Sequence, residues 1–261
     1  MAQSDPESVT IDTRTLAAGE AAWLTIDRRK RLNALDSALM DRVAEQLGSL
    51  AERPGLRAVV LTGAGGRAFI GGADIGELAG VRDPQEAEAF IRRVHDVCRC
   101  LRDLPVPVIA RIDGYALGAG MEVAAACDIR IASTDAVFGM PEVKVGIPSV
   151  VEAALLPGLI GWGHTRELLL FGRNIDADTA CHWGFVDRLV PPEELDTTIR
   201  EYLEALSETG ARAVMLQKRL IRKWETLPLD EAIEAGVRAF AMAWDDDEPT
   251  VMLNAFGNRK R

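Results

Sequence analysis

Apolar residues along the chain follow two alternating spacings, one typical of buried strands and one typical of amphipathic helices. Four apolar runs flanked by turn residues predict strands at 21–27, 58–62, 105–114 and 127–133. Helical spacing predicts helices between them. One is capped by Asp36 and carries an apolar stripe, another runs over 84–103 with a proline at its start, and a short third covers 117–126. The stripe after Asp36 consists of Leu39, Met40, Val43, Leu47 and Leu50.

Beyond a loop at 141–148 the pattern becomes mostly helical. Helices are predicted over 162–171, 178–183, 193–207, 211–224 and 229–244. The alternation of strands and helices up to about residue 190 predicts an α/β core. We therefore divide the chain into a flexible tail over 1–8, a core over 9–191 and a helical region over 192–261.

Composition narrows the possible partners. The formal net charge of −10 argues against a nucleic-acid partner, because phosphate binding requires a concentrated basic surface. No apolar run approaches the ~20 residues of a membrane span, and the polar, acidic start predicts no targeting peptide. The four cysteines have no spacing suited to metal or disulfide, so we expect reduced thiols and a cytoplasmic location.

One glycine-rich stretch resembles a dinucleotide-binding turn. Residues 63–68, Gly-Ala-Gly-Gly-Arg-Ala, follow a strand and fit the pattern G-x-G-x-x-G/A. That fingerprint requires a helix beginning at the turn and an acidic residue ending the next strand. Here the motif runs into Phe-Ile-Gly-Gly, and the acid at the expected distance, Asp83, precedes a helix. The pattern therefore does not favour NAD.

Two other glycine-rich stretches, 71–78 and 114–132, each follow a strand and run toward helical residues. Such junctions leave backbone N–H groups without helical partners, and small residues allow a ligand to approach closely. Facing each other, the two junctions could bind an oxygen that develops negative charge. Taken alone, the glycines are equally consistent with tight helix-packing turns.

Five motifs resemble those of the crotonase family, the enoyl-CoA hydratase/isomerase superfamily. They occur in the family's order and spacing: RLNALD at 31–36, RAFIGGADIGEL at 67–78, IDGYALGAGMEVAAACDIRIAS at 112–133, AVFGMPEVKVGIP at 136–148 and GFVDRLVP at 184–191. The resemblance implies the crotonase (ClpP-like) fold, a superhelix of ββα units. It also implies an oxyanion hole formed by the backbone N–H groups of Ala73 and Ala119, beside Gly118.

The family's two catalytic glutamates fall on Glu122 and Glu142. Glu122 stands in an apolar stretch, where a merely structural carboxylate is expensive, and Glu142 follows Pro141 in a loop. Two nearby carboxyl groups titrate apart and can share one proton at neutral pH. The resemblance thus implies an enoyl-CoA hydratase, with Glu122 acting on the water at the β-carbon and Glu142 exchanging the α-carbon proton.

The resemblance also implies how coenzyme A binds. It indicates contacts from the basic turn, through Lys30, Arg31, Leu32 and Ala34. It also indicates contacts from the glycine junction at 71–78, through Gly71, Ala73 and Ile75. The resemblance is weaker for two C-terminal residues, Phe256 and Arg259. Within the run 28–31, one or two basic residues are expected to be merely solvated. Coenzyme A is part of the substrate, so no separate cofactor or metal is expected. The helical region is expected to form a homotrimer, or a hexamer made of two trimers.

The sequence departs from the family after Glu142, where the shortened, bulkier segment 146–154 borders the expected acyl pocket. Within it Glu152 is either a third carboxylate near the site or, as we favour, an outward-facing residue at a helix start. Family isomerases typically lack the Glu122 partner, so the pair favours a hydratase. A related isomerase, decarboxylase or hydrolase, a non-catalytic acyl-CoA-binding protein and an NAD-dependent oxidoreductase stay open as alternatives. His95, His164 and His182 occupy no motif position and are expected to be structural or exposed.

Overall fold

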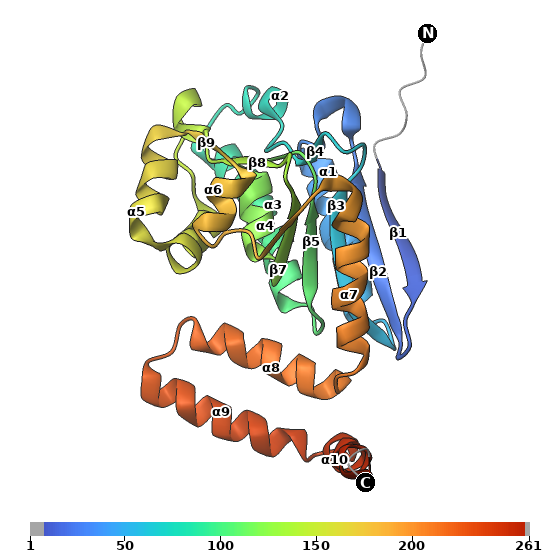
Figure 1. Ribbon diagram of the computed structural model, residues 1–261. Coiled ribbons are helices and arrows are strands. Elements are labelled where there is room, and N and C mark those ends of the chain that lie inside the picture. The colour runs from blue at the N-terminus through green and yellow to red at the C-terminus, as the bar shows by residue number, and fades with distance from the viewer. Residues whose placement is uncertain (1–7, 259–261) are drawn as a thin grey trace.

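The computed structural model describes residues 8–258, in which two sheets lie among helices (Figure 1). The larger sheet has the order β1-β2-β3-β5-β7-β10. Its strands are β1 (Ser8–Thr15), β2 (Glu20–Asp27), β3 (Leu56–Gly63), β5 (Val108–Ile112), β7 (Ile129–Ser133) and β10 (Arg188–Val190). β1 pairs antiparallel with β2, and the other pairs are parallel.

The smaller sheet has the order β4-β6-β8-β9 and consists of three-residue strands. They are β4 (Ala68–Ile70), β6 (Tyr115–Leu117), β8 (Val137–Gly139) and β9 (Asn174–Asp176). Three times the chain leaves a strand of the large sheet, adds a strand to the small sheet and then enters a helix. These are the ββα units that the resemblance implied.

Helices connect and cover the sheets. The core helices are α1 (Ser37–Ala51), α2 (Ile75–Leu78), α3 (Pro84–Asp103), α4 (Ala119–Ala126), α5 (Leu156–Phe171), α6 (Ala177–His182) and α7 (Leu195–Ser207). Short 3-10 turns are η1 (Arg29–Arg31), η2 (Glu142–Val145), η3 (Val151–Leu155) and η4 (Pro192–Glu194). Asp36 caps α1 by accepting from the Leu39 amide at 2.8 Å, as predicted, and the apolar stripe of that helix is buried.

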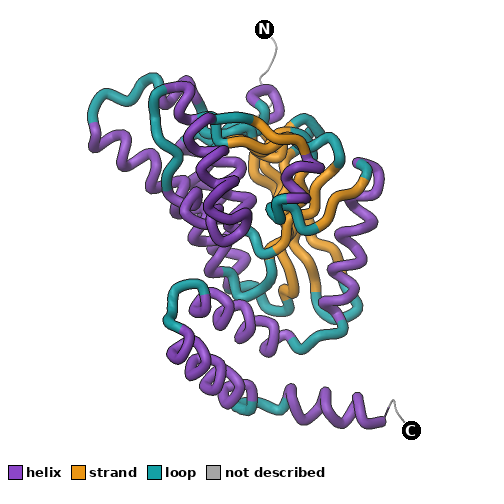
Figure 2. The backbone as a smooth tube through the Cα atoms, turned by 60° about the vertical axis from the view of Figure 1, so that its left-hand side comes forward, coloured by secondary structure: helices purple, strands orange, loops and turns teal. Residues whose placement is uncertain are grey.

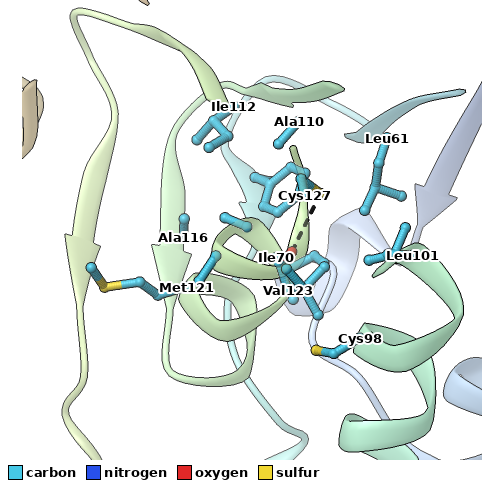
Figure 3. Packing of buried hydrophobic residues seen from close by; sticks show 14 of the residues in the cluster. Leu61, Ile70, Cys98, Leu101, Ala110, Ile112, Ala116, Met121, Val123 and Cys127 are labelled. Carbon is cyan, nitrogen blue, oxygen red and sulfur yellow. Dashed lines mark hydrogen bonds between the residues drawn. The ribbon is translucent and has the colours of Figure 1, made fainter. Parts of the chain in front are cut away.

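Apolar side chains are buried on both faces of the large sheet. The larger cluster joins the sheet to α1, α3 and α4, and Figure 3 shows part of it, including Cys98 of α3 and Val123 of α4. A smaller cluster joins the other face to α7 through residues such as Trp23, Val60 and Ile199. The sheet is therefore buried on both sides, in agreement with the uninterrupted apolar pattern of β3.

The last three helices, α8 (Ala211–Trp224), α9 (Leu229–Ala243) and α10 (Glu248–Asn258), project away from the sheets (Figure 2). The boundaries of α8 match the prediction, and α10 was not predicted as a separate helix. No described helix is long and apolar enough to cross a bilayer. All four cysteines are free thiols, and Cys98 and Cys127 are buried as small core residues.

Sequence patterns missed β1 and the short strands. β1 begins at Ser8, one residue inside the predicted tail, and its outer residues are exposed because it is an edge strand. The strands of the small sheet are too short to show a period. At residues 63–68 the chain turns into β4 and not into a helix, so the structural context of a dinucleotide turn is missing there.

Candidate active site

A cavity of about 210 Å³ opens where the loop after β4, the start of α4, α3 and the segment from η2 to residue 150 come together. It brings together seven of the residues that the sequence singled out. These are Gly71, Ala73, Ile75, Gly118, Ala119, Glu122 and Glu142. Segments about 70 residues apart in the sequence thus meet in one site.

Ala73 and Ala119, whose backbone amides the resemblance assigns to an oxyanion hole, both line this cavity. Around Ala73, the parallel bridge to Leu35 uses the Gly72 carbonyl (2.8 Å from the Leu35 amide) and the Asp74 amide (2.8 Å from the Leu35 carbonyl). The Ala73 amide therefore takes no part in this bridge. Ala119 is the first residue of α4, where an amide has no partner within the helix. Neither amide donates a hydrogen bond to another group within residues 8–258.

Gly118 brings the start of α4 close to Glu142. Its φ of 52° and ψ of −121° suit glycine alone. A Cβ at this position would overlap Oε1 of Glu142. The absence of a side chain at 118 therefore lets the Glu142 carboxylate lie directly against the turn that carries the Ala119 amide.

Glu122, in the first turn of α4, is 3% exposed. Its Oε1 accepts a hydrogen bond from the Ala153 amide at 3.2 Å. Burial, and next the negative charge of Glu142, raise the pKa of Glu122 from its ordinary 4.5 to about 8, although the Ala153 amide acts in the opposite direction. At neutral pH Glu122 is therefore protonated.

Glu142 begins η2 and is half-buried. Its Oε2 accepts a hydrogen bond from the Ser149 hydroxyl at 2.7 Å, because the left-handed Gly146 turns the chain back after η2. Sequence reasoning missed Ser149. A single serine at this position belongs to no sequence pattern. Only the turn at Gly146 brings Ser149, seven residues after Glu142, beside the Glu142 carboxylate.

Glu152 lies inside the fold, so the favoured prediction of an outward-facing residue was wrong. It is 7% exposed, and its Oε1 lies 2.9 Å from Nδ1 of His95 on α3. The segment forms the 3-10 turn η3, preceded by an extended Val150, and not the first turn of an α-helix. This geometry directs residue 152 toward α3 and α4, and Glu152 is the third carboxyl group near the cavity that the sequence left as an alternative.

The basic turn lies beside the cavity but does not line it. Arg28 is structural, with ion pairs to Asp36 at 3.1 Å and to Asp74 at 2.6 Å, and Arg29 pairs with Asp27. Lys30 and Arg31 are exposed on η1. The expectation that one or two of the four basic residues are merely solvated does not fit Arg28, whose side chain is only 10% exposed and closes the turn through its ion pairs.

Leu32 and Ala34 continue this turn toward the glycine junction, and neither lines the cavity. The Leu32 carbonyl accepts from the Gly71 amide at 2.8 Å, which ties the turn to the glycine junction. Leu32 and Asn33 adopt positive φ values of 54° and 56°. Buried Asn33 holds this conformation, because its Nδ2 donates to the carbonyls of Ala64 (3.0 Å) and Ala68 (2.7 Å).

Phe256 does not line the cavity of the same chain. Phe256 lies on α10, which is at the opposite end of the fold from α2 in Figure 1. Arg259 lies outside the described residues. His164 stacks on Trp183 with ring centroids 4.0 Å apart, away from the cavity lining.

A larger cavity, of about 420 Å³, lies between α8 and the core. The Nζ of its buried Lys218 donates to Asp128 (2.6 Å) and to the carbonyls of Leu101 (3.1 Å) and Val106 (2.9 Å). Its buried cation is thus satisfied by the protein itself, which is typical of a structural ion pair. In the part of the chain that the structure describes, no three His, Cys, Asp or Glu side chains are grouped as metal ligands.

Comparisons with known proteins show the family to which the chain belongs. The enoyl-CoA hydratase/isomerase family profile matches residues 18–260. The chain is 36% identical to a short-chain-enoyl-CoA hydratase of Clostridium acetobutylicum, and the match covers 93% of both chains. It is 32% identical to a crotonyl-CoA hydratase of Syntrophomonas wolfei, and that match covers 92% of both chains. It superposes on an enoyl-CoA hydratase of Bacillus anthracis with a TM-score of 0.89, at 32% identity and 96% coverage of both chains. The chain therefore belongs to the enoyl-CoA hydratase/isomerase family and has the crotonase fold.

Proposed function

We propose that this protein is an enoyl-CoA hydratase, a hydro-lyase that adds water reversibly across the double bond of a 2-enoyl-CoA. One observation carries the proposal: Ala73, Ala119 and the two glutamates line the same cavity, and neither alanine amide donates a backbone hydrogen bond within residues 8–258. The amides suit a thioester oxygen, and the carboxyl groups suit the two proton transfers of hydration. The activities for which the relatives in Clostridium and Syntrophomonas are named support it.

The amides of Ala73 and Ala119 act as the oxyanion hole. When water adds at the β-carbon, negative charge develops on the thioester oxygen, and two fixed donors stabilise that charge without reorganisation. The Ala119 amide also lies at the start of an α-helix, where the helix dipole adds about 0.3–1 kcal/mol of stabilisation for a negative charge. Loss of one such donor typically lowers kcat by ~10²–10³.

The two glutamates share one proton. For hydration, Glu122 accepts a proton from water as the water oxygen bonds to the β-carbon, and Glu142 donates a proton to the α-carbon. In the free site burial keeps the proton on Glu122. A water bound between the two carboxyl groups passes it to Glu142 before addition. Addition then leaves Glu122 protonated and Glu142 ionised, which restores the resting state.

Apolar side chains of α3 and of the 146–154 segment form the acyl part of the cavity. They include Phe90, Ile91, Val94, Ile147 and Val150. The cavity of about 210 Å³ supports a short-chain 2-enoyl group. Coenzyme A is part of the substrate, and we assign its nucleotide end to the turn that carries Lys30, Arg31, Leu32 and Ala34, next to Gly71.

The exposed apolar face of the helical region supports self-association, as a trimer or a pair of trimers. Leu229, Phe240 and Trp244 are 75%, 71% and 51% exposed, and Val251 and Leu253 of α10 are also exposed. So many large apolar side chains on adjacent helices form a surface of the kind that subunit contacts cover. Such contacts also provide a place for Phe256 and Arg259 near the nucleotide of a neighbouring copy.

The test is hydration of crotonyl-CoA by the purified protein. The variants Glu122→Gln and Glu142→Gln are each expected to lose ~10²–10⁴ in kcat while still binding acyl-CoA, since amides cannot exchange the proton. Glu88→Gln, an exposed substitution on α3, serves as the matched control. An inactive wild type that binds acyl-CoA would indicate a non-catalytic protein. Near wild-type turnover in either glutamine variant would exclude the role given to that glutamate.

A further inference from the structure

Glu152 is a buried carboxyl group that the hydration mechanism above does not use. It lies on η3, which packs against both α4 and α3. The next residue, Ala153, donates its amide to the Glu122 carboxyl at 3.2 Å. Glu152 does not line the cavity, and its chain neighbour Ala153 places it next to Glu122.

Among residues 8–258, only one of the two carboxyl oxygens of Glu152 has a hydrogen-bond partner. Oε1 lies 2.9 Å from His95 Nδ1, and the His95 side chain is 46% exposed, so this pair reaches solvent. Oε2 is buried and has no hydrogen-bond partner among residues 8–258. Leaving a buried carboxylate oxygen unpaired is destabilising, because the oxygen loses its hydration without gaining a hydrogen bond. A purely structural link between η3 and α3 does not require a carboxylate at position 152, because a neutral glutamine can also form a hydrogen bond with His95.

The charge of Glu152 acts on its neighbours. It is one of the negative charges that raise the pKa of Glu122, after burial and Glu142. The same field reaches Cys98 on α3, where burial and then the charges of Glu152 and Glu122 raise the pKa of the thiol. The titratable groups facing Glu152 are thus Glu122 on α4, His95 and Cys98 on α3, and Glu142 on η2 beyond Glu122.

We propose that Glu152, held by His95, is a positioning residue that retains the shared proton in the Glu122–Glu142 pair at neutral and mildly alkaline pH. Because like charges disfavour ionisation, a carboxylate next to Glu122 makes loss of that proton more difficult. Its effect on turnover rests on the proposed hydratase function. The effect of the Glu152 charge on the pKa of Glu122 does not depend on that function.

The main test compares the pH dependence of kcat/KM for crotonyl-CoA hydration in the wild type and in Glu152→Gln. The glutamine keeps an acceptor for His95 and removes the charge. We expect the alkaline limb to move to lower pH by on the order of one unit, with little change at pH 6. Glu152→Asp keeps the charge, so its alkaline limb should lie closer to that of the wild type. The limb of the control Glu88→Gln should coincide with that of the wild type. An unmoved limb in Glu152→Gln, or equal shifts in both Glu152 variants, would overturn the proposal.

A second measurement does not depend on turnover. The infrared band of the buried protonated carboxyl, identified by its loss in Glu122→Gln, is titrated in the wild type and in Glu152→Gln. The midpoint should fall in Glu152→Gln, and an unchanged midpoint would refute the coupling. If the wild type does not hydrate crotonyl-CoA, the proposed function fails, and this titration still decides the role of Glu152.

Discussion

Burial of Glu122 makes the stability of the protein depend on pH in a way that one substitution should remove. Its pKa is raised from 4.5 in the unfolded chain to about 8 in the fold, so the folded state holds a proton that the unfolded state releases. The native state is therefore stabilised fully below about pH 4.5, and this contribution is lost as the pH rises toward 8. Each unit of difference is about 1.4 kcal/mol, so the whole shift corresponds to about 5 kcal/mol.

Glu122→Gln cannot ionise, and its amide oxygen can still accept from Ala153. We expect the variant to lie within about 1 kcal/mol of the wild type in free energy of unfolding at pH 5 and to exceed it by about 3–5 kcal/mol at pH 9. Urea unfolding followed by tryptophan fluorescence at pH 5, 7 and 9, at a single protein concentration, measures this difference. Glu88→Gln should show no such divergence. If wild type and Glu122→Gln lose stability in parallel between pH 5 and pH 9, the fold does not raise the pKa of Glu122 as argued.

Two further substitutions test the geometry of the site and of the helical region. Gly118→Ala forces a Cβ into the space of Glu142 Oε1 at a φ of 52°, so it should lower kcat for crotonyl-CoA by about 10²-fold or more with an unchanged circular dichroism spectrum. An active Gly118→Ala enzyme would show that Glu142 need not lie against this turn. Phe240→Asp places a charge on the exposed apolar face of α9 and should lower the sedimentation coefficient from that of an oligomer toward that of a monomer. An unchanged coefficient would place the subunit contacts elsewhere.

Local patterns predicted the parts of the fold whose cause is local. The Asp36 cap, the buried stripe of α1 and the boundaries of α8 follow from residue types at helical spacing. Family motifs further along the chain indicated Ala73, Ala119, Glu122 and Glu142, and the structure brings all four to one cavity. The edge strand β1 and the small sheet were missed, since three-residue strands and a mostly exposed edge show no clear period.

Glu152 shows where a one-dimensional pattern stops being sufficient. A glutamate near a predicted helix start is normally solvated, and nothing adjacent in the sequence indicates His95, 57 residues earlier. The same holds for Ser149, whose contact with Glu142 depends on the left-handed turn at Gly146. Both contacts are made by side chains from segments whose relative placement is set by packing.

Sequence patterns therefore determined the main helices and four strands of the large sheet, and the family resemblance implied the ββα units and pointed to the two glutamates. Only the tertiary structure decided that Ala73 and Ala119 share a cavity with those glutamates, and that burial raises the pKa of Glu122. The physical reason is that hydrogen-bond capping and apolar periodicity act within a few residues along the chain. Desolvation and like-charge repulsion, which set the protonation of the site, depend on distances between segments that the completed core alone fixes.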